Sequence, residues 1–287
     1  MENRMNHLLC FGLGFSARAL AERLSGQSWL ITGTSRSAQG AAAIAARGYR
    51  AFVYDGTAPL PPEALTGVTH VLVSAPPDAA GDPVLRHCTA QLQRLAPRWA
   101  GYLSTTGVYG DRAGAWVTED DPLSPSTERG ARRLAAEQDW LATGLPMHLF
   151  RLAGIYGPGR NQLESVRDGM ARRIIKEGQV FSRIHVADIA TVLEASIAAP
   201  RPGRAYNVCD DLPCPPQEVI AYAADLLHVP PPPEVDFAAA ELSPMARSFY
   251  AESKKVSNRR IKSELGVSLA YPTYREGLQA LLAALTP

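Results

Sequence analysis

A glycine-rich turn near the start of the chain limits the fold more than any other part of the sequence. The apolar run His7-Leu8-Leu9-Cys10-Phe11 predicts a strand, and it is followed by Gly12-Leu13-Gly14-Phe15-Ser16-Ala17 and a segment with helical spacing. Gly12 suits a tight turn, Gly14 keeps side chains away from a ligand, and Ala17 allows close packing of helix on strand. The helix start offers free N–H groups and a positive dipole end. The turn therefore predicts binding of a dinucleotide pyrophosphate by Gly12, Gly14, Phe15, Ser16 and Ala17.

Strand and helix patterns alternate along the chain after this turn. A glycine turn alone also occurs between strands and helices that bind nothing, so this context decides its meaning. Repeated alternation requires right-handed crossovers and a doubly wound parallel sheet. We predict an α/β protein with a Rossmann domain over residues 1–155 and a smaller C-terminal substrate lobe over 156–287, from which segments can return to the sheet. Strands are expected at 29–31, 49–54, 69–75, 100–105 and 147–152, and helices at 38–47, 83–95, 127–143, 163–177 and 185–199.

The residues at the carboxyl ends of these strands form the expected binding cleft. In an open parallel sheet the ligand lies outside those ends. We therefore expect cofactor contacts from the glycine turn and from the residues that follow the other strands, namely Thr34, Ser35, Arg36, Asp55, Gly56, Ser74, Ala75 and Pro76.

The end of the second strand predicts which dinucleotide binds. NAD-selective proteins carry a carboxylate there, about 20 residues past the glycines, to bind the ribose 2′-hydroxyl. This chain instead has Thr32-Gly33-Thr34-Ser35-Arg36-Ser37. A guanidinium offers planar, charge-assisted donors to a phosphate, and a missing carboxylate removes repulsion. Arg36 therefore favours NADP over NAD, although a solvated arginine at a strand end is the alternative.

Composition excludes several classes of function. With 287 residues and 46% hydrophobic content, the chain can bury a large core, and its net charge of +1 gives no sign of a nucleic-acid partner. No apolar run approaches the length of a membrane span and no leader precedes the first strand, so we expect a cytoplasmic protein with no membrane partner. The four cysteines lack metal or dithiol spacing, and we expect no metal.

Five motifs in order resemble the extended short-chain dehydrogenase/reductase family, the nucleotide-sugar epimerases and dehydratases. The resemblance covers nearly the whole chain. It implies that Thr105, in the serine or threonine position before Val-Tyr-Gly, binds the reacting oxygen of the substrate. The motifs are the glycine turn, Leu103-Ser104-Thr105-Thr106-Gly107-Val108-Tyr109-Gly110, Arg151-Leu152-Ala153-Gly154-Ile155-Tyr156-Gly157-Pro158-Gly159, Arg183-Ile184-His185-Val186-Ala187-Asp188 and Lys255-Val256-Ser257-Asn258.

The chain departs from this family at its catalytic pair. The family has a tyrosine and, one helical turn later, a lysine that lowers the tyrosine pKa and holds the nicotinamide ribose. Arg129 and Arg133 occupy the two positions here. Arg133 can still bind ribose hydroxyls, but Arg129 cannot accept a proton because a guanidinium is always charged. The resemblance is therefore to an atypical branch of the family.

Two functions remain open. The chain is either an NADP(H)-dependent oxidoreductase or epimerase/dehydratase-like enzyme acting on a carbonyl or hydroxyl, or a non-catalytic NADP(H)-binding sensor or regulator. In the enzyme, Tyr109, Tyr156 or a water held by Thr105 supplies the proton, while Arg129 or Arg160 binds an anionic small-molecule substrate. The expected helices at 83–95 and 127–143 pair across a two-fold axis in many members of the family, so the resemblance also allows a homodimer.

Other polar groups are expected to be structural. In the family resembled, the segment that contains His185 and Asp188 ties the small lobe to the sheet through hydrogen bonds. We expect Glu119-Asp120-Asp121 to be a solvated loop near the rim of the cleft.

Overall fold

A seven-stranded sheet forms the centre of this computed structural model, which describes residues 5–285. Its strand order is β11-β7-β5-β4-β1-β2-β3. The pairs β1/β2, β1/β4, β2/β3 and β4/β5 are parallel, so the predicted doubly wound α/β sheet is confirmed. The strands are β1 His7–Phe11, β2 Leu30–Ser35, β3 Arg50–Val53, β4 His70–Val73, β5 Trp99–Thr105, β7 Met147–Leu152 and β11 Ala205–Val208.

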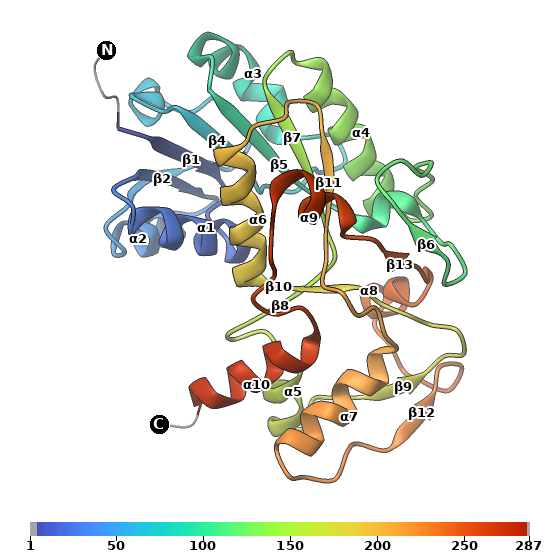
Figure 1. Cartoon of the computed structure of the whole chain (residues 1–287). Coiled ribbons are helices and arrows are strands. Elements are labelled where there is room, and N and C mark those ends of the chain that lie inside the picture. Colours follow the sequence, from blue (N-terminus) through green and yellow to red (C-terminus); the bar gives the residue numbers. More distant parts are fainter. Residues whose placement is uncertain (1–4, 286–287) are drawn as a thin grey trace. The chain divides into compact units, whose positions relative to one another are not determined.

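Helices cover both faces of the sheet. Figure 1 shows α1, α2 and α6 on one face and α3 and α4 on the other. Every residue of β1, β4 and β7 is buried. Nearly continuous apolar runs of this kind are typical of parallel strands covered on both faces. The helices are α1 Phe15–Ser25, α2 Ala38–Ala45, α3 Pro83–Leu95, α4 Glu128–Ala142 and α6 Val186–Ala198, with short 3-10 turns η1 Pro62–Leu65 and η2 Thr106–Tyr109.

Contacts divide the chain into two compact units, each assembled from three segments. The first contains Met1–Thr105, Ala131–Arg151 and Ile189–Tyr206. The second contains Thr106–Gly130, Leu152–Asp188 and Asn207–Pro287. The chain therefore returns to the first unit after residue 155, while Thr106–Gly130 belongs to the second unit.

The second unit combines short strand pairs with helices. Its helical core packs Tyr156, Leu163, Val219, Tyr274 and Leu278 together. The strand pairs are β6 Trp116–Val117 with β13 Lys255–Val256, β8 Gly154–Tyr156 with β10 Arg183–His185, and β9 Arg173–Ile175 with β12 Glu234–Asp236. The helices are α5 Gln162–Arg167, α7 Pro216–Leu226, α8 Pro244–Phe249, α9 Arg259–Leu265 and α10 Tyr274–Leu285.

The helix predicted over residues 163–177 is wrong beyond its first turns. Helix α5 begins after Asn161, whose side chain accepts the Glu164 N–H, and it ends at Arg167. Gly169 then adopts a left-handed φ of +67°. The following residues pair with β12 as strand β9, where β-branched isoleucines pack well. Tertiary pairing therefore overrides the helical spacing.

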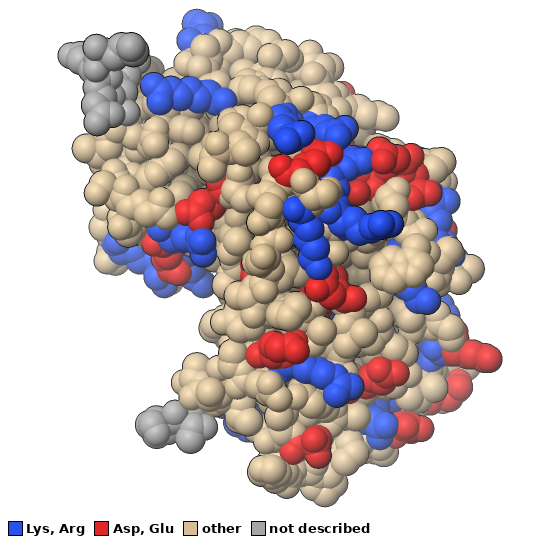
Figure 2. Space-filling model, viewed as in Figure 1, with Lys and Arg blue, Asp and Glu red and all other residues tan. Residues whose placement is uncertain are grey.

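Charged side chains of both signs are interspersed on the face shown in Figure 2. None of the helices within residues 5–285 combines the length and apolar character that crossing a membrane requires. In the same part of the chain, no three His, Cys, Asp or Glu side chains are grouped closely enough to hold a metal ion.

Candidate functional site

The glycine turn of the first unit is fixed by the second strand. Gly12 has a φ of +84°, and a Cβ at this position would lie 3.4 Å from the Ala75 nitrogen. The Gly12 N–H donates to the Thr34 hydroxyl at 2.9 Å, and the Leu13 N–H donates to the Thr34 carbonyl at 3.0 Å. Thr34, which the sequence predicts as a cofactor contact, is buried and connects β2 to the turn. Its contribution to ligand binding stays a prediction.

The start of helix α1 fits a pyrophosphate. Gly14 is its N-cap residue, no side chain caps the helix, and the first turn contains no acidic residue. A Cβ built on Gly14 meets no atom within 4 Å, so open space lies next to this backbone. Ser16 and Ala17 follow as buried residues. An exposed glycine at an uncapped helix start suits an anion because backbone N–H groups and the helix dipole both attract it.

Gly33 is a determinant of the turn that the sequence reasoning missed. It lies within β2, and a Cβ there would come within 2.7 Å of the Leu13 Cδ2. Leu13 therefore packs over the bare backbone of the strand. An isolated glycine within a strand pattern is the signal that indicates such a close approach.

Substitution of Gly33 by alanine should displace Leu13 and disturb the turn. We expect a loss of about 1–3 kcal/mol in the free energy of unfolding, as for other overpacked sites. Gly26→Ala is the matched control, because its added Cβ lies 3.7 Å from the nearest atom and its φ is −65°. Denaturant unfolding of both variants checks this; equal stability of the two would contradict the packing argument.

Arg36 is the first residue after strand β2. Its side chain is exposed, and the second strand contributes no carboxylate between Thr32 and Ser37. Ser37 caps helix α2 by accepting the Gly40 N–H. A Cβ at Gly40 would fall 2.0 Å from the Ser35 hydroxyl, so the helix start approaches Ser35 closely. The guanidinium of Arg36 is thus presented to solvent at the carboxyl end of the strand.

The ends of β3 and β4 lie in the same sheet as the glycine turn. Strand β1 lies between β4 and β2, and β2 pairs with β3. The Ser74 and Ala75 N–H groups donate to the Phe11 carbonyl, which places this loop against the end of β1, and Pro76 follows exposed. Asp55 precedes Gly56, and hydrogen bonds from Thr57 lower the pKa of the Asp55 carboxyl. The fold therefore brings the predicted cofactor residues of β1 to β4 to one edge.

Strand β5 carries Thr105 and holds Arg133. Thr105 ends the strand and is partly buried. The Arg133 Nη1 donates to the Leu103 carbonyl at 2.5 Å and to the Tyr102 hydroxyl at 3.2 Å. The guanidinium also lies 5.5 Å from the Tyr102 ring centroid. Arg133 is therefore attached to the strand that ends in Thr105, and both residues belong to the first unit.

Both candidate proton donors of the second unit are buried. The Tyr109 hydroxyl donates to the Asn207 Oδ1 at 2.7 Å. The Tyr156 hydroxyl donates to the Thr273 carbonyl at 3.4 Å, and burial raises the pKa of Tyr156 above its usual range. A Cβ on Gly277 would lie 2.0 Å from the Tyr156 hydroxyl, so helix α10 packs directly on this group.

Arg129 and Arg160, the predicted substrate-binding residues, are exposed side chains of the second unit. Arg129 lies in the first turn of α4. Arg160 lies in a tight turn in which its backbone exchanges hydrogen bonds of 3.0 Å with Gly157. That these two arginines bind the substrate stays a prediction.

Glu119 is not solvated as expected. Its side chain is only 4% exposed, and its Oε1 accepts the Asn207 N–H at 2.8 Å. The Arg260 Nε lies 3.7 Å from its other carboxylate oxygen. The Asp188 carboxylate accepts the N–H groups of Ala270 and Tyr271, which lie in the same unit, so the expected tie to the sheet stays a prediction.

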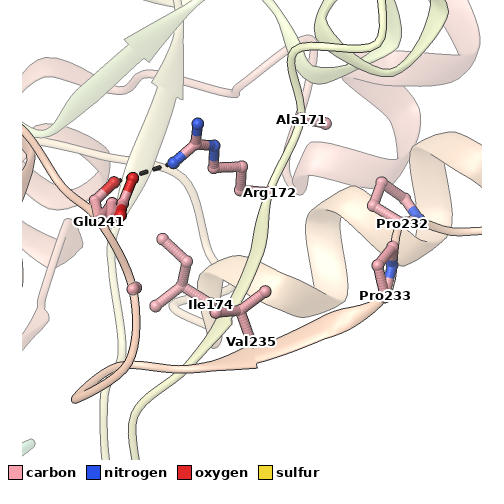
Figure 3. A pocket seen from close by; sticks show the side chains of 8 residues that line it. Ala171, Arg172, Ile174, Pro232, Pro233, Val235 and Glu241 are labelled. Atoms are coloured by element: carbon pink, nitrogen blue, oxygen red, sulfur yellow. Dashed lines mark hydrogen bonds between the residues drawn. The ribbon is translucent and has the colours of Figure 1, made fainter.

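Two of the cavities among the described residues lie in the second unit, and none of the predicted site residues lines them. One of about 180 Å³ is lined by Ile174, Val235 and two prolines, with the Arg172 guanidinium bonded to the Glu241 carbonyl at its edge (Figure 3). The other, of about 430 Å³, shares Pro232 with the first. Both are mainly apolar.

Comparisons with known proteins show which solved structures share this fold. No family model matches the chain. A functionally unknown conserved protein from Silicibacter pomeroyi DSS has 56% identity and a TM-score of 0.92, over 98% of this chain and 99% of that one. Protein YeeZ of Escherichia coli K12 is 27% identical over 289 residues, 93% of this chain and 97% of that protein. A candidate NAD-dependent epimerase/dehydratase from Methylobacillus flagellatus is 28% identical, with a TM-score of 0.74. The match covers 99% of this chain and 100% of that one.

The chain has the fold of the NAD-dependent epimerase/dehydratase-like proteins, as the resemblance in its sequence implied. MoeE5, solved in complex with UDP-glucose and NAD, shares the extended short-chain dehydrogenase/reductase fold at 19% identity, over 97% of each chain and with a TM-score of 0.77. Arg129 and Arg133 occupy the positions at which the resemblance predicts a tyrosine and a lysine, and this equivalence stays a prediction.

Proposed function

We propose that the first unit binds NADP(H) and that the protein is an oxidoreductase or epimerase/dehydratase-like enzyme acting on a carbonyl or hydroxyl of a small molecule. The observation that carries this proposal is the uncapped start of α1 with open space at Gly14. The fold supports it, since MoeE5 was solved with a dinucleotide.

Different residues around the glycine turn are proposed to bind different parts of the dinucleotide. The N–H groups at the start of α1 would hold the pyrophosphate, Asp55 and Gly56 would lie beside the adenosine, and Ser74 to Pro76 would lie along the rest of the dinucleotide. A bound nicotinamide supplies hydride transfer. The Thr105 hydroxyl, at the end of β5, hydrogen-bonds the reacting oxygen of the substrate and orients it.

NADP(H) is proposed over NAD(H) because of Arg36. The related MoeE5 structure contains NAD. The present chain offers an exposed guanidinium and no carboxylate at the end of β2. A ribose 2′-phosphate would meet an attractive charge and no repulsive one, whereas NAD would gain nothing from the arginine.

The substrate is proposed to carry an anionic group. Arg129 stands in place of the family tyrosine and cannot accept a proton, but its exposed guanidinium can bind a carboxylate or phosphate. Arg160 offers a second exposed guanidinium in the same unit. Proton transfer then falls to Tyr109, Tyr156 or a water held by Thr105, and either tyrosine must first exchange its present acceptor.

A non-catalytic NADP(H)-binding protein is the second candidate. It is favoured by the hydrogen bonds that hold the hydroxyls of Tyr109 and Tyr156 and by the absence of the tyrosine and lysine pair. Loss of nicotinamide absorbance during incubation of the protein and NADPH with anionic carbonyl compounds would establish an oxidoreductase. An epimerase/dehydratase-like enzyme returns the hydride to its substrate, so chromatography of the incubated compounds would be needed to detect its product. Saturable NADPH binding without turnover across such a panel would favour the sensor.

Substitution of Gly14 by alanine tests the site directly. Because a Cβ at this position meets no protein atom, the variant should fold with a thermal midpoint close to wild type. The added methyl group would occupy the space proposed for pyrophosphate, and we expect the Kd for NADPH, measured by fluorescence titration, to rise by at least about tenfold. Unchanged affinity would place the dinucleotide elsewhere, and failure of wild type to bind NADPH or NADH would refute the proposed function.

A further inference from the structure

A buried charged cluster lies between helix α4 and the sheet in the first unit. Glu137, on α4, is 1% exposed, and Arg151, on β7, is 5% exposed. The Arg151 guanidinium contacts both Glu137 carboxylate oxygens, with Nη2 at 2.9 Å and Nε at 3.2 and 3.3 Å. The Ser104 hydroxyl, on β5, donates to the Glu137 Oε1 at 2.5 Å. One carboxylate thus joins a helix to two neighbouring strands.

Burying this charged cluster between a helix and a sheet has a large desolvation cost. Removing two charges from water costs several kcal/mol per ion, and an apolar contact of similar volume often stabilises a protein as well. A buried ion pair instead specifies the register of the helix against the strand, because its hydrogen bonds are satisfied in only one register. The cluster therefore fixes where α4 lies along β5.

The register of α4 against β5 also sets the position of Arg133. Arg133 precedes Glu137 by one helical turn and lies on the same side of α4. It donates to the Leu103 carbonyl, next to the residue that bonds Glu137. Two successive turns of α4 are therefore bonded to two successive residues of β5, directly before Thr105.

We propose that Ser104, Glu137 and Arg151 form a positioning network that sets Arg133 and Thr105 at the cofactor end of β5. This inference rests on the proposed dinucleotide site. The three residues do not contact the ligand; they act through Arg133, which stands where the family lysine holds the nicotinamide ribose. Because Arg133 is bonded to β5, its position depends on where α4 lies along that strand.

Removal of the Ser104 hydroxyl tests the network. Ser104→Ala should raise the Kd for NADPH about fivefold to tenfold, within the range of coupling between contacting residues. Ser196→Ala is the matched control, because Ser196 is also fully buried and its hydroxyl accepts the Trp99 Nε1–H at the opposite end of β5. Ser196→Ala should lower stability but leave the Kd unchanged.

A double-mutant cycle separates positioning from general destabilisation. Arg133→Ala should weaken NADPH binding about tenfold, and Ser104→Ala should add almost nothing to it, because the network acts through Arg133. Additive losses, or equal effects of Ser104→Ala and Ser196→Ala on the Kd, would overturn the proposal. Glu137→Gln, if it folds, should behave as Ser104→Ala does.

Hydrogen exchange gives a readout that needs no cofactor. Amides of residues 131–135 should exchange at least about tenfold faster in Ser104→Ala than in wild type, and at the wild-type rate in Ser196→Ala. If wild type binds neither NADPH nor NADH, the proposed function fails, while this exchange pattern still decides whether the network positions α4. Unchanged exchange in Ser104→Ala would overturn it.

Discussion

Arg36→Asp will weaken NADPH binding about a hundredfold and change the Kd for NADH by less than about threefold, because the substitution replaces a charge-assisted donor by a repulsive carboxylate. The new carboxylate can also accept a bond from the 2′-hydroxyl of NADH, the arrangement of NAD-selective proteins. Arg36 is exposed at the end of β2, so the substitution leaves the core intact. Parallel fluorescence titrations with the two cofactors measure the ratio.

Arg98→Asp is the control for long-range charge. Arg98 is also exposed, but it precedes β5 and therefore lies at the opposite end of the parallel strands. The same change in net charge there should leave both affinities nearly unaffected at physiological salt, where charges beyond about 8 Å are screened. A comparable loss of NADPH binding in both variants, or equal losses for NADPH and NADH in Arg36→Asp, would remove the assignment of Arg36 to the 2′-phosphate.

Asp210→Asn will stabilise the protein at pH 8. Asp210 is 1% exposed, and within residues 5–285 its Oδ2 has no hydrogen-bond partner. Burial raises the pKa of its carboxyl from 3.8 to about 7, and the nearby Arg183 only partly opposes this. At pH 8 the wild-type protein must therefore keep a buried carboxylate whose Oδ2 has no hydrogen-bond partner, whereas asparagine is neutral.

The pH dependence has a definite sign. Because the folded pKa is raised, Asp210 favours folding below about pH 4, and this contribution is lost as the pH rises through about 7. The full loss is about 4 kcal/mol for a shift of this size. We expect Asp210→Asn to raise the thermal midpoint by about 5–10 °C at pH 8. The difference from wild type should shrink towards pH 4.

Asp225→Asn is the matched control for this experiment. Asp225 is an exposed carboxylate on α7 in the same unit. Its replacement should change the thermal midpoint little at either pH, as for other surface substitutions. A pH-independent difference between Asp210→Asn and wild type would show that Asp210 does not titrate in this range.

Periodicity and turn residues were enough to predict the elements of the sheet. The strand at 147–152 and the helix at 83–95 have the predicted bounds, because apolar runs and proline or glycine boundaries are local signals. The second strand extends to Ser35 rather than Ile31, since pairing with β3 holds Thr32 to Ser35 in the sheet. Arg36 is accordingly the first residue beyond that strand.

Contacts between distant residues could not be predicted in this way. Thr34 is predicted as a cofactor contact by its position, and only the structure shows that its hydroxyl also accepts the Gly12 N–H. Glu119 looks like part of a solvated charge run, yet it is buried against Asn207 and Arg260. In both cases the hydrogen-bonding partner lies far away in the sequence, and no local pattern of residues predicts the contact.

The sequence by itself determined the doubly wound sheet and the glycine turn, and it places Arg129 and Arg133 where the family that it resembles has a tyrosine and a lysine. These follow from residue type and short spacing, which act through backbone angles, burial and fixed charge. Only the tertiary structure decided that Arg133 is bonded to β5 and that Glu137 joins Ser104 to Arg151. The reason is physical: the value of a buried charge depends on which partner reaches it, and folding alone brings that partner within hydrogen-bond distance.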